Sequence, residues 1–276
     1  MKPIGLLLLL VVLASGFGLQ TLAVDMPLPV GMWLFEEEND TMVKDSSLED
    51  NDGEIKGSLK RGTGKFGKGL VFDGVNDNYV EIPDSDSLDM TENISVLFWF
   101  STTKLMSPLN RWSDRQVVVG KNVYEYEVGI YDSGIIHTYT NGLQSVDAFG
   151  HSYDEGISIS MADTIDPEFR LDTWYHVAWT LDGKIERVYV NGIEFFNESG
   201  KPYEKNTLGT LPGNNPLEIG RRPVGGEFGG ELSFKGTLDE VAVYNVTLDA
   251  DQIKEIVEVG LAESFNQALI NFRTTS

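Results

Sequence analysis

Short stretches in which apolar and polar residues alternate dominate most of the chain. Stretches such as "NYVEI" and "ERVYVNG" change character at every second residue, which is the period of a β-strand with one buried face. Glycine, asparagine and aspartate separate these stretches and are typical of tight turns. Many short strands between regular turns, with little helical periodicity, predict an all-β fold built as an antiparallel two-sheet β-sandwich.

The stretch "DTWYHVAWTLDGKIERVYVNG" shows this pattern most clearly. Tyr175, Val177 and Trp179 are expected on one face of a strand and His176 on the other. The Asp-Gly pair in the middle favours a tight hairpin turn. The surrounding sequence offers His176 neither a nucleophile nor a second histidine at ligand spacing, so we interpret it as a structural residue.

Helical periodicity is confined to the end of the chain. In "LDADQIKEIVEVGL", Asp249 is placed to cap a short helix, Gln252 completes a capping box, and Gly260 suits the exit. Residues 263–276 form a tail that either adds a helical turn or frays. Residues 145–170 have weaker strand periodicity and are expected to form a long loop or insertion.

Composition narrows the possible partners. Acidic residues outnumber basic ones 43 to 21 among 276 residues, giving a formal net charge of −22. Such a charge repels phosphates, so neither nucleic acid nor an anionic membrane is an expected partner. The chain has no cysteine, which excludes disulfides and thiolate zinc sites.

The N-terminus has the three parts of a secretory signal peptide. Lys2 precedes the apolar run "IGLLLLLVVLASGFGL", and Thr21 and Ala23 provide small residues for cleavage. We therefore expect residues 1–23 to be a signal peptide, residues 24–262 to be one domain, and the protein to be secreted. The apolar run is short for a bilayer span, so no membrane insertion is expected after cleavage.

Four segments in order resemble the laminin-G-like domain of the concanavalin A-like lectin/glucanase superfamily. They are "GKFGKGLVFDGVNDNYVEIPDSDSLDMTENISVLFWFST", the hairpin stretch quoted above, "LEIGRR" and "FKGTLDEVAVYNVTLDADQI". The resemblance covers most of the chain after the signal peptide and implies a jelly roll of two packed antiparallel sheets. Members are often carbohydrate- or protein-binding modules of secreted and surface proteins, and some relatives are glycoside hydrolases.

No complete catalytic motif is present. Glycoside hydrolysis usually needs two carboxylates that face each other across the sugar. The nearest fragment is "YEYEVG", where Glu125 and Glu127 are expected on one face of a strand. The glucanase branch has a third acid and a middle acid, and both are missing here. We therefore expect no catalytic residues, with a hydrolase using this non-standard pair as the alternative.

The resemblance also implies a structural calcium ion that ties the first strand to the last. Carried onto this sequence, it makes Asp239 the main ligand, with Gly74, Asp73 and Glu36 nearby. Two alternatives stay open: a separate loop site built on Asp45 and Asp52, or acids that are merely solvated turn residues.

The pentraxin branch of the superfamily binds ligand through paired calcium ions held by acids after the segment that corresponds to "LEIG". Arg221 and Arg222 occupy that position here, so this mode of binding is not expected.

A ligand site is expected where an aromatic side chain lies among polar groups in a loop. Trp112 is such a residue, because "SPLNRWSDRQ" is polar and also contains Arg111 and Arg115. Tyr139 and Asn141, in "HTYTNG", are further candidates.

The sequence therefore favours a secreted, non-catalytic, lectin-like module with a structural calcium, which recognises a glycan or an extracellular protein. A glycoside hydrolase of the same fold and a purely structural or adhesive domain are the alternatives. The oligomeric state stays open.

Overall fold

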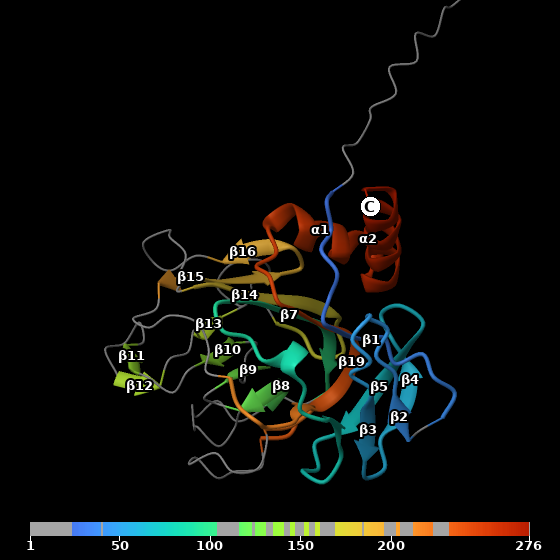
Figure 1. The fold of residues 1–276 in the computed structure, drawn as a ribbon. Helices are drawn as coiled ribbons and strands as arrows, with labels where there is room; N and C mark the ends of the chain where they lie inside the picture. Colours follow the sequence, from blue (N-terminus) through green and yellow to red (C-terminus); the bar gives the residue numbers. More distant parts are fainter. Residues whose placement is uncertain are drawn as a thin grey trace, which may run out of the picture.

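The fold is a sandwich of two antiparallel sheets in a computed structural model (Figure 1). The structure describes residues 24–39, 41–103, 116–122, 125–130, 135–140, 144–146, 152–154, 158–160, 169–183, 185–195, 203–204, 212–222 and 232–275. Within these residues the predicted all-β, two-sheet architecture is confirmed.

The first sheet has nine strands in the order β16-β15-β14-β7-β19-β5-β4, with β1 paired to β19 and β17 paired to β15. Its strands are β1 (Gly31–Trp33), β4 (Lys60–Thr63), β5 (Lys68–Asp73), β7 (Asn93–Thr102), β14 (Tyr175–Asp182), β15 (Ile185–Val190), β16 (Ile193–Phe195), β17 (Tyr203–Glu204) and β19 (Lys235–Tyr244).

The second sheet has eight strands in the order β13-β10-β9-β8-β18-β6-β3-β2. They are β2 (Met42–Val43), β3 (Gly53–Lys56), β6 (Tyr79–Ile82), β8 (Gln116–Asn122), β9 (Tyr126–Ile130), β10 (Ile135–Thr140), β13 (Ser158–Ser160) and β18 (Leu217–Ile219). A short 3₁₀ helix, η1 (Asp86–Leu88), precedes β7.

The main hydrophobic core lies between the two sheets and contains the inward-facing residues of both. In the β14–β15 hairpin, Tyr175, Val177 and Trp179 join this core, whereas Ala178 and Tyr189 belong to a second apolar cluster. The alternation predicted for this hairpin is confirmed, and each sheet therefore has an inner and an outer face.

Two helices cover the outer face of the nine-stranded sheet (Figure 1). Helix α1 (Ala250–Val259) begins at the predicted capping box of Asp249 and Gln252. Helix α2 (Leu261–Thr275) follows after one residue. The predicted tail is thus a second full helix, because Leu261 and Ala268 supply a stripe that packs in the second apolar cluster.

The region expected to be a long loop contains short strands. Strands β11 (Gln144–Val146) and β12 (Ser152–Asp154) pair with each other, and β13 extends the eight-stranded sheet by pairing with β10. Strands of three residues are too short to show an alternating pattern, which explains why the sequence did not indicate them.

Candidate functional site: the outer face of the eight-stranded sheet

The outer face of the eight-stranded sheet carries a row of glutamates. The register pairs Glu54 with Glu81, Glu81 with Glu218, Glu218 with Gly120, and Gly120 with Glu127. Their sequence neighbours on these strands contribute to the core between the sheets, so the glutamates face outward. Four acids from four strands therefore share one face, with a glycine between the last two.

Two consecutive arginines after β18 neutralise two of these glutamates. Arg221 Nε and NH2 donate to Glu218 over 2.6 and 3.1 Å. Arg222 Nε and NH2 donate to Glu127 over 2.7 and 2.5 Å. All four side chains are buried. Both are bidentate pairs, which are the most strongly oriented ion pairs in proteins.

Arg221 also connects this face to the turn before β6. Its guanidinium lies 3.3 Å from the centroid of the Tyr79 ring and donates to the Asn76 carbonyl over 3.0 Å. Burial raises the pKa of the Glu218 carboxyl, and the hydrogen bonds from Arg221 oppose that shift. Lys56 bridges the other two acids, Glu54 at 2.7 Å and Glu81 at 3.3 Å.

A fully buried lysine lies at the end of β8. The Lys121 ammonium contacts Asp89, lies 2.8 Å from Asp84 and 3.0 Å from Glu125. Asn215 donates to the other Glu125 oxygen over 2.5 Å. Burial raises the pKa of Glu125, and the contacts with Asn215 and Lys121 oppose the shift. This network joins β8, the η1 region and the loop before β18.

The two glutamates considered as a catalytic pair have different partners. Glu125 precedes β9 and binds Lys121 and Asn215, whereas Glu127 lies within β9 and gives one oxygen to each nitrogen of the Arg222 fork. The sequence separation predicted their proximity, but it carried no sign of these cations, which come from β8 and from the loop after β18.

Most of the predicted ligand-binding residues lie outside the described residues: Arg111, Trp112, Arg115 and Asn141. Tyr139 is described as part of β10, and the register places it opposite Glu127. Tyr139 is thus the one candidate ligand residue that the structure describes, and its strand lies next to that of Glu127. Arg221 and Arg222 entered the sequence analysis only as evidence against a pentraxin-type site. In the structure they are the main basic residues of the candidate face.

The predicted calcium ligands divide between two ends of β5. Glu36 accepts from the Lys68 amide and Asp239 from the Phe66 amide, each over 2.8 Å. Asp73 pairs with Lys235, four residues before Asp239, which corresponds to about 13 Å along a strand.

Asp73 and the adjacent Gly74 are part of a turn. The Asp73 carboxylate accepts from the Val75 amide over 2.9 Å and from Asn78 over 2.7 Å, and Gly74 has a φ of +82°. Such bonds are typical of an aspartate that shapes a turn. Glu36 and Asp239 thus each bind a backbone amide of the β4–β5 hairpin, whereas Asp73 and Gly74 lie at the other end of β5.

Asp239 and Glu240 lie side by side at a bulge in β19 but serve different elements. Burial raises the pKa of Asp239 to about 8 and that of Glu240 to about 7. Asp239 Oδ1 has no hydrogen-bond partner, whereas Glu240 accepts from the Leu261 amide over 3.0 Å and so caps helix α2.

The alternative loop site is organised by donors that point at an aspartate. Asp45 Oδ1 accepts from the Met32 and Ser47 amides, and Oδ2 accepts from the Ser47 hydroxyl and the Asn51 amide. Asp52 accepts from the Asp45 amide and binds Lys44. N–H and O–H groups that converge on a carboxylate satisfy it without a metal ion.

In the part of the chain that the structure describes, no three His, Cys, Asp or Glu side chains are grouped so that they could hold a metal ion. The calcium ion therefore stays a prediction from the family resemblance, and of its four predicted ligands only Glu36 and Asp239 bind the same hairpin.

A family model described as the concanavalin A-like lectin/glucanases superfamily matches residues 73–254. The chain belongs to this superfamily. The match spans more than half of the chain and includes β6, β8, β9 and β18 of the candidate face, whereas β3 lies before it. No curated protein matches the sequence significantly.

Solved structures with the same fold include several binding domains of the superfamily's jelly-roll type. Domain 4 of AbnA, an extracellular arabinanase from Geobacillus stearothermophilus, was solved with arabinotriose; it has a TM-score of 0.58 and 16% identity, over 83% of this chain and 98% of that one. The binding domain of Paraclostridial Mosquitocidal Protein 1 has a TM-score of 0.62 and 16% identity, over 83% of this chain and 52% of that one.

The binding domain of botulinum neurotoxin serotype G has a TM-score of 0.59 and 12% identity, over 84% of this chain and 51% of that one. This superfamily member therefore spans about half the length of the two toxin binding domains. At these identities the similarity establishes a shared fold.

Proposed function

We propose that this protein is a secreted, non-catalytic module that binds carbohydrate on the outer face of the eight-stranded sheet. The observation that carries the proposal is the pair of Glu–Arg contacts on either side of Gly120. These buried pairs order the face, and Lys56 and Glu81, which stay partly exposed beside them, offer polar groups to sugar hydroxyls. Because Lys56 and Glu81 already bind each other at 3.3 Å, little side-chain freedom is lost when a sugar binds.

The arrangement of the two outer faces supports this assignment. Helices α1 and α2 seal the outer face of the nine-stranded sheet with apolar contacts, whereas the opposite face presents charged groups and the half-buried Tyr79 ring. Sugar sites combine an aromatic surface with a few fixed polar groups. The complex of the arabinanase domain with arabinotriose supports carbohydrate as the ligand class.

A binding role fits the glutamates better than hydrolysis does. A general acid must hold a proton that it can pass to the leaving group. Of the pair considered for catalysis, Glu127 binds the Arg222 guanidinium through both oxygens, which favours its ionised form. Glu125 is held by Lys121 and Asn215. Release of reducing sugar by the purified chain would contradict the non-catalytic assignment.

The proposal of secretion rests on the signal-peptide pattern of residues 1–23. Val24, the first residue after the predicted signal peptide, packs against the second apolar cluster, and Gln252 donates to the Asp25 carbonyl over 2.7 Å. Among the described residues, no helix is long and apolar enough to cross a membrane. Expression of the full chain in a secreting host, followed by N-terminal sequencing, should give Val24 as the first residue.

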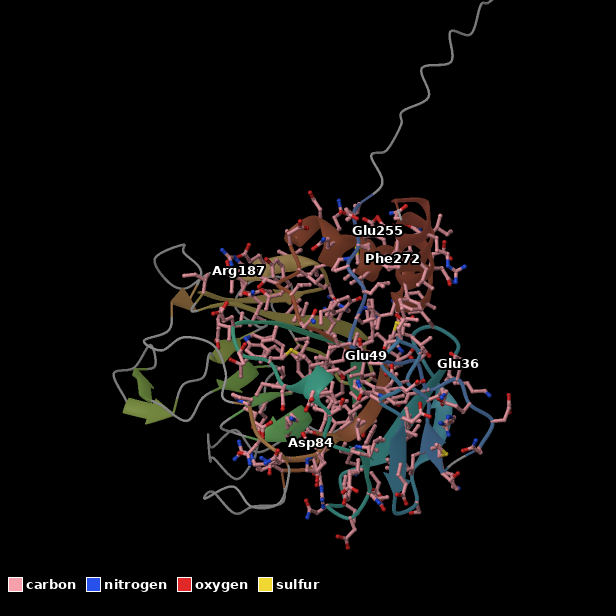
Figure 2. All side chains as sticks on the ribbon, in the orientation of Figure 1. Glu36, Glu49, Asp84, Arg187, Glu255 and Phe272 are labelled. Atoms are coloured by element: carbon pink, nitrogen blue, oxygen red, sulfur yellow. The ribbon has the colours of Figure 1, made fainter. Side chains whose placement is uncertain are left out.

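The test of carbohydrate binding is a glycan array probed with residues 24–276, in calcium and again in EDTA. We expect selective binding that the Tyr79→Ala and Glu81→Gln variants lose. Both residues are only partly buried, so these changes should leave the fold intact. Glu255→Gln in α1 is the matched control, because it alters a carboxylate on the helix-covered side (Figure 2).

A blank array from folded protein in both buffers would overturn the carbohydrate proposal. It would favour a protein partner or a structural, adhesive role. Binding that Tyr79→Ala and Glu81→Gln leave unchanged would place the site elsewhere on the domain.

A further inference from the structure

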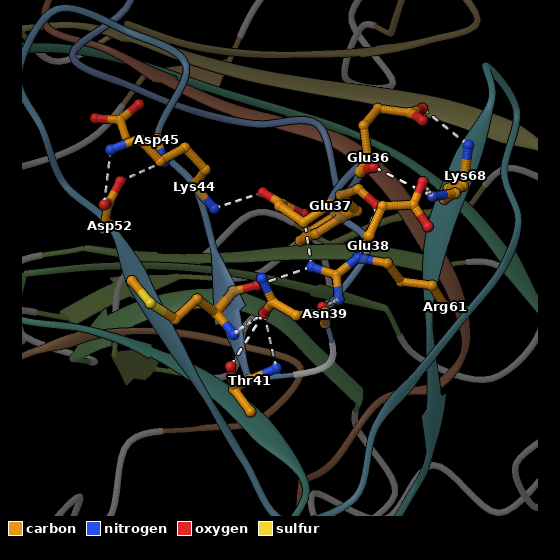
Figure 3. A network of polar contacts seen from close by, with 12 residues as sticks. Glu36, Glu37, Glu38, Asn39, Thr41, Lys44, Asp45, Asp52, Arg61 and Lys68 are labelled. Carbon is orange, nitrogen blue, oxygen red and sulfur yellow. Dashed lines mark hydrogen bonds and ion pairs between the residues drawn. The ribbon is translucent and has the colours of Figure 1, made fainter.

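A guanidinium group fills the space enclosed by the acidic segment, residues 36–39. Arg61, on β4, reaches into this segment, and four oxygens accept its N–H groups (Figure 3). They are the carbonyls of Phe35 at 3.0 Å from Nε, Met42 at 2.8 Å from NH2 and Asn39 next to NH1, and the carboxylate of Glu37 at 2.6 Å from NH2.

The neighbouring glutamates of the segment are bound by other basic residues. Glu36 accepts from the Lys68 amide over 2.8 Å, and Glu38 lies 2.7 Å from the Lys68 ammonium. The second oxygen of Glu37 accepts from the Lys44 amide over 2.5 Å. Each glutamate of "EEE" therefore already has a donor, and the donors come from β5 and from the region after β2 (Figure 3).

The oxygens around Arg61 are of the kind that calcium prefers. Three backbone carbonyls and one carboxylate converge on one positive group, and carbonyl and carboxylate oxygens are the usual calcium ligands. A guanidinium keeps its charge at all physiological pH values and offers five N–H donors in a fixed plane. The Arg61 side chain is only 7% exposed, so it occupies the interior of the segment.

We propose that Arg61 is the resident cation of the acidic segment and supplies, among the oxygens of Phe35, Glu37, Asn39 and Met42, the positive charge that a bound calcium ion would otherwise provide. The segment is then ordered by a covalently attached charge, and its structure does not depend on the calcium concentration. This inference concerns the N-terminal segment and stands independently of carbohydrate binding on the eight-stranded sheet.

The test compares thermal unfolding of the wild type with Arg61→Ala, each in EDTA, in calcium chloride and in low-millimolar guanidinium chloride. Removing Arg61 leaves four oxygens without donors, so we expect the unfolding midpoint to fall by roughly 5–10 °C. Added guanidinium or calcium should recover part of the loss in the variant, by binding the vacated site, and should leave the wild-type midpoint unchanged.

Arg187→Ala is the matched control, because Arg187 forms a partly exposed pair with Glu194 at 3.3 Å. Arg187→Ala should change the unfolding midpoint little, and added guanidinium should not alter the midpoint of this variant. If Arg61→Ala does not fold, Arg61→Lys provides the same comparison, since it keeps the charge and loses the planar fork. Either of two results overturns the proposal: a midpoint for the variant equal to that of the wild type, or equal gains from calcium in both proteins.

Discussion

The two outer faces of the sandwich are built by the same alternation of residues and yet differ in kind. On the nine-stranded sheet, Leu97 and Ala242 point outward and are covered by α1 and α2. On the eight-stranded sheet, Glu127 and Glu218 take the equivalent outward positions and are neutralised by arginines. One face is closed by burial of apolar surface, and the other is held by charge pairing.

This difference explains how one domain can be rigid and still offer a polar surface. An apolar face exposed to water has to be covered, which the C-terminal helices do. The Glu–Arg pairs of the other face are buried as well, and their burial is tolerated because each charge has a bidentate partner. Figure 2 shows Asp84 and Phe272 on opposite sides of the molecule, next to the charged network and on the helical cover respectively.

The largest expected effect is on the charged side. Lys121→Met leaves Asp84, Asp89 and Glu125 without their common cation, and removing one partner of a buried ion pair costs about 3–5 kcal/mol. Urea unfolding should show this loss in the free energy of unfolding. Lys254→Met is the control, since Lys254 lies on the surface at 3.9 Å from Glu258; equal effects of the two changes would refute the role of the network.

On the apolar side, Ile256→Ala should loosen the helical cover. Ile256 is fully buried in the second apolar cluster, and truncation of such a residue costs about 2–5 kcal/mol. Ile270→Ala, at a position 62% exposed on α2, should cost little. If carbohydrate binding is affected by Ile256→Ala more than by Tyr79→Ala, the assignment of separate roles to the two faces is wrong.

His176 is a polar exception within the apolar side, and it predicts a pH dependence. Its ring is buried against Trp99, and burial lowers its pKa from 6.5 to about 3. Below pH 6.5 the unfolded chain takes up a proton that the folded chain refuses, so stability falls as the pH falls towards 3.

Between pH 6.5 and pH 5, the free energy of unfolding of the wild type should fall by about 2 kcal/mol more than that of His176→Phe. Urea unfolding of both proteins over this range measures the difference. Parallel pH profiles would show that His176 has a hydrogen-bond partner or contact with water.

The smallest effect is expected at the start of the helical cover. Asp249 accepts from the Gln252 amide over 2.9 Å and completes a capping box. Asp249→Ala should therefore cost about 1 kcal/mol of unfolding free energy. Asp251→Ala, in the first turn of α1 and outside the cap, is the comparison; a loss as large as that of Asp249→Ala would indicate a general charge effect.

Local patterns predicted the sheets well, because alternation and turn residues act over a few positions. The β14–β15 hairpin, its Asp-Gly turn and the capping box of α1 all follow from neighbouring residues. The sequence does not decide whether α2 forms a full helix, because its apolar stripe is stabilised only by packing on the apolar outer face of the nine-stranded sheet.

The charge pairs could not be predicted in the same way. Arg61 and Glu37 are separated by 24 residues, and Arg222 and Glu127 by 95. The sequence showed a cluster of acids and a run of basic residues, and a calcium ion was the natural partner for the acids. Only the register of the strands brings each acid to its own arginine or lysine.

The most direct test of the two-face account is hydrogen–deuterium exchange of residues 24–276, with and without a saccharide selected from the array. The account predicts slower exchange in β6, β18 and β9 on binding, with no change in α1 and α2. Slower exchange confined to the helices would contradict it.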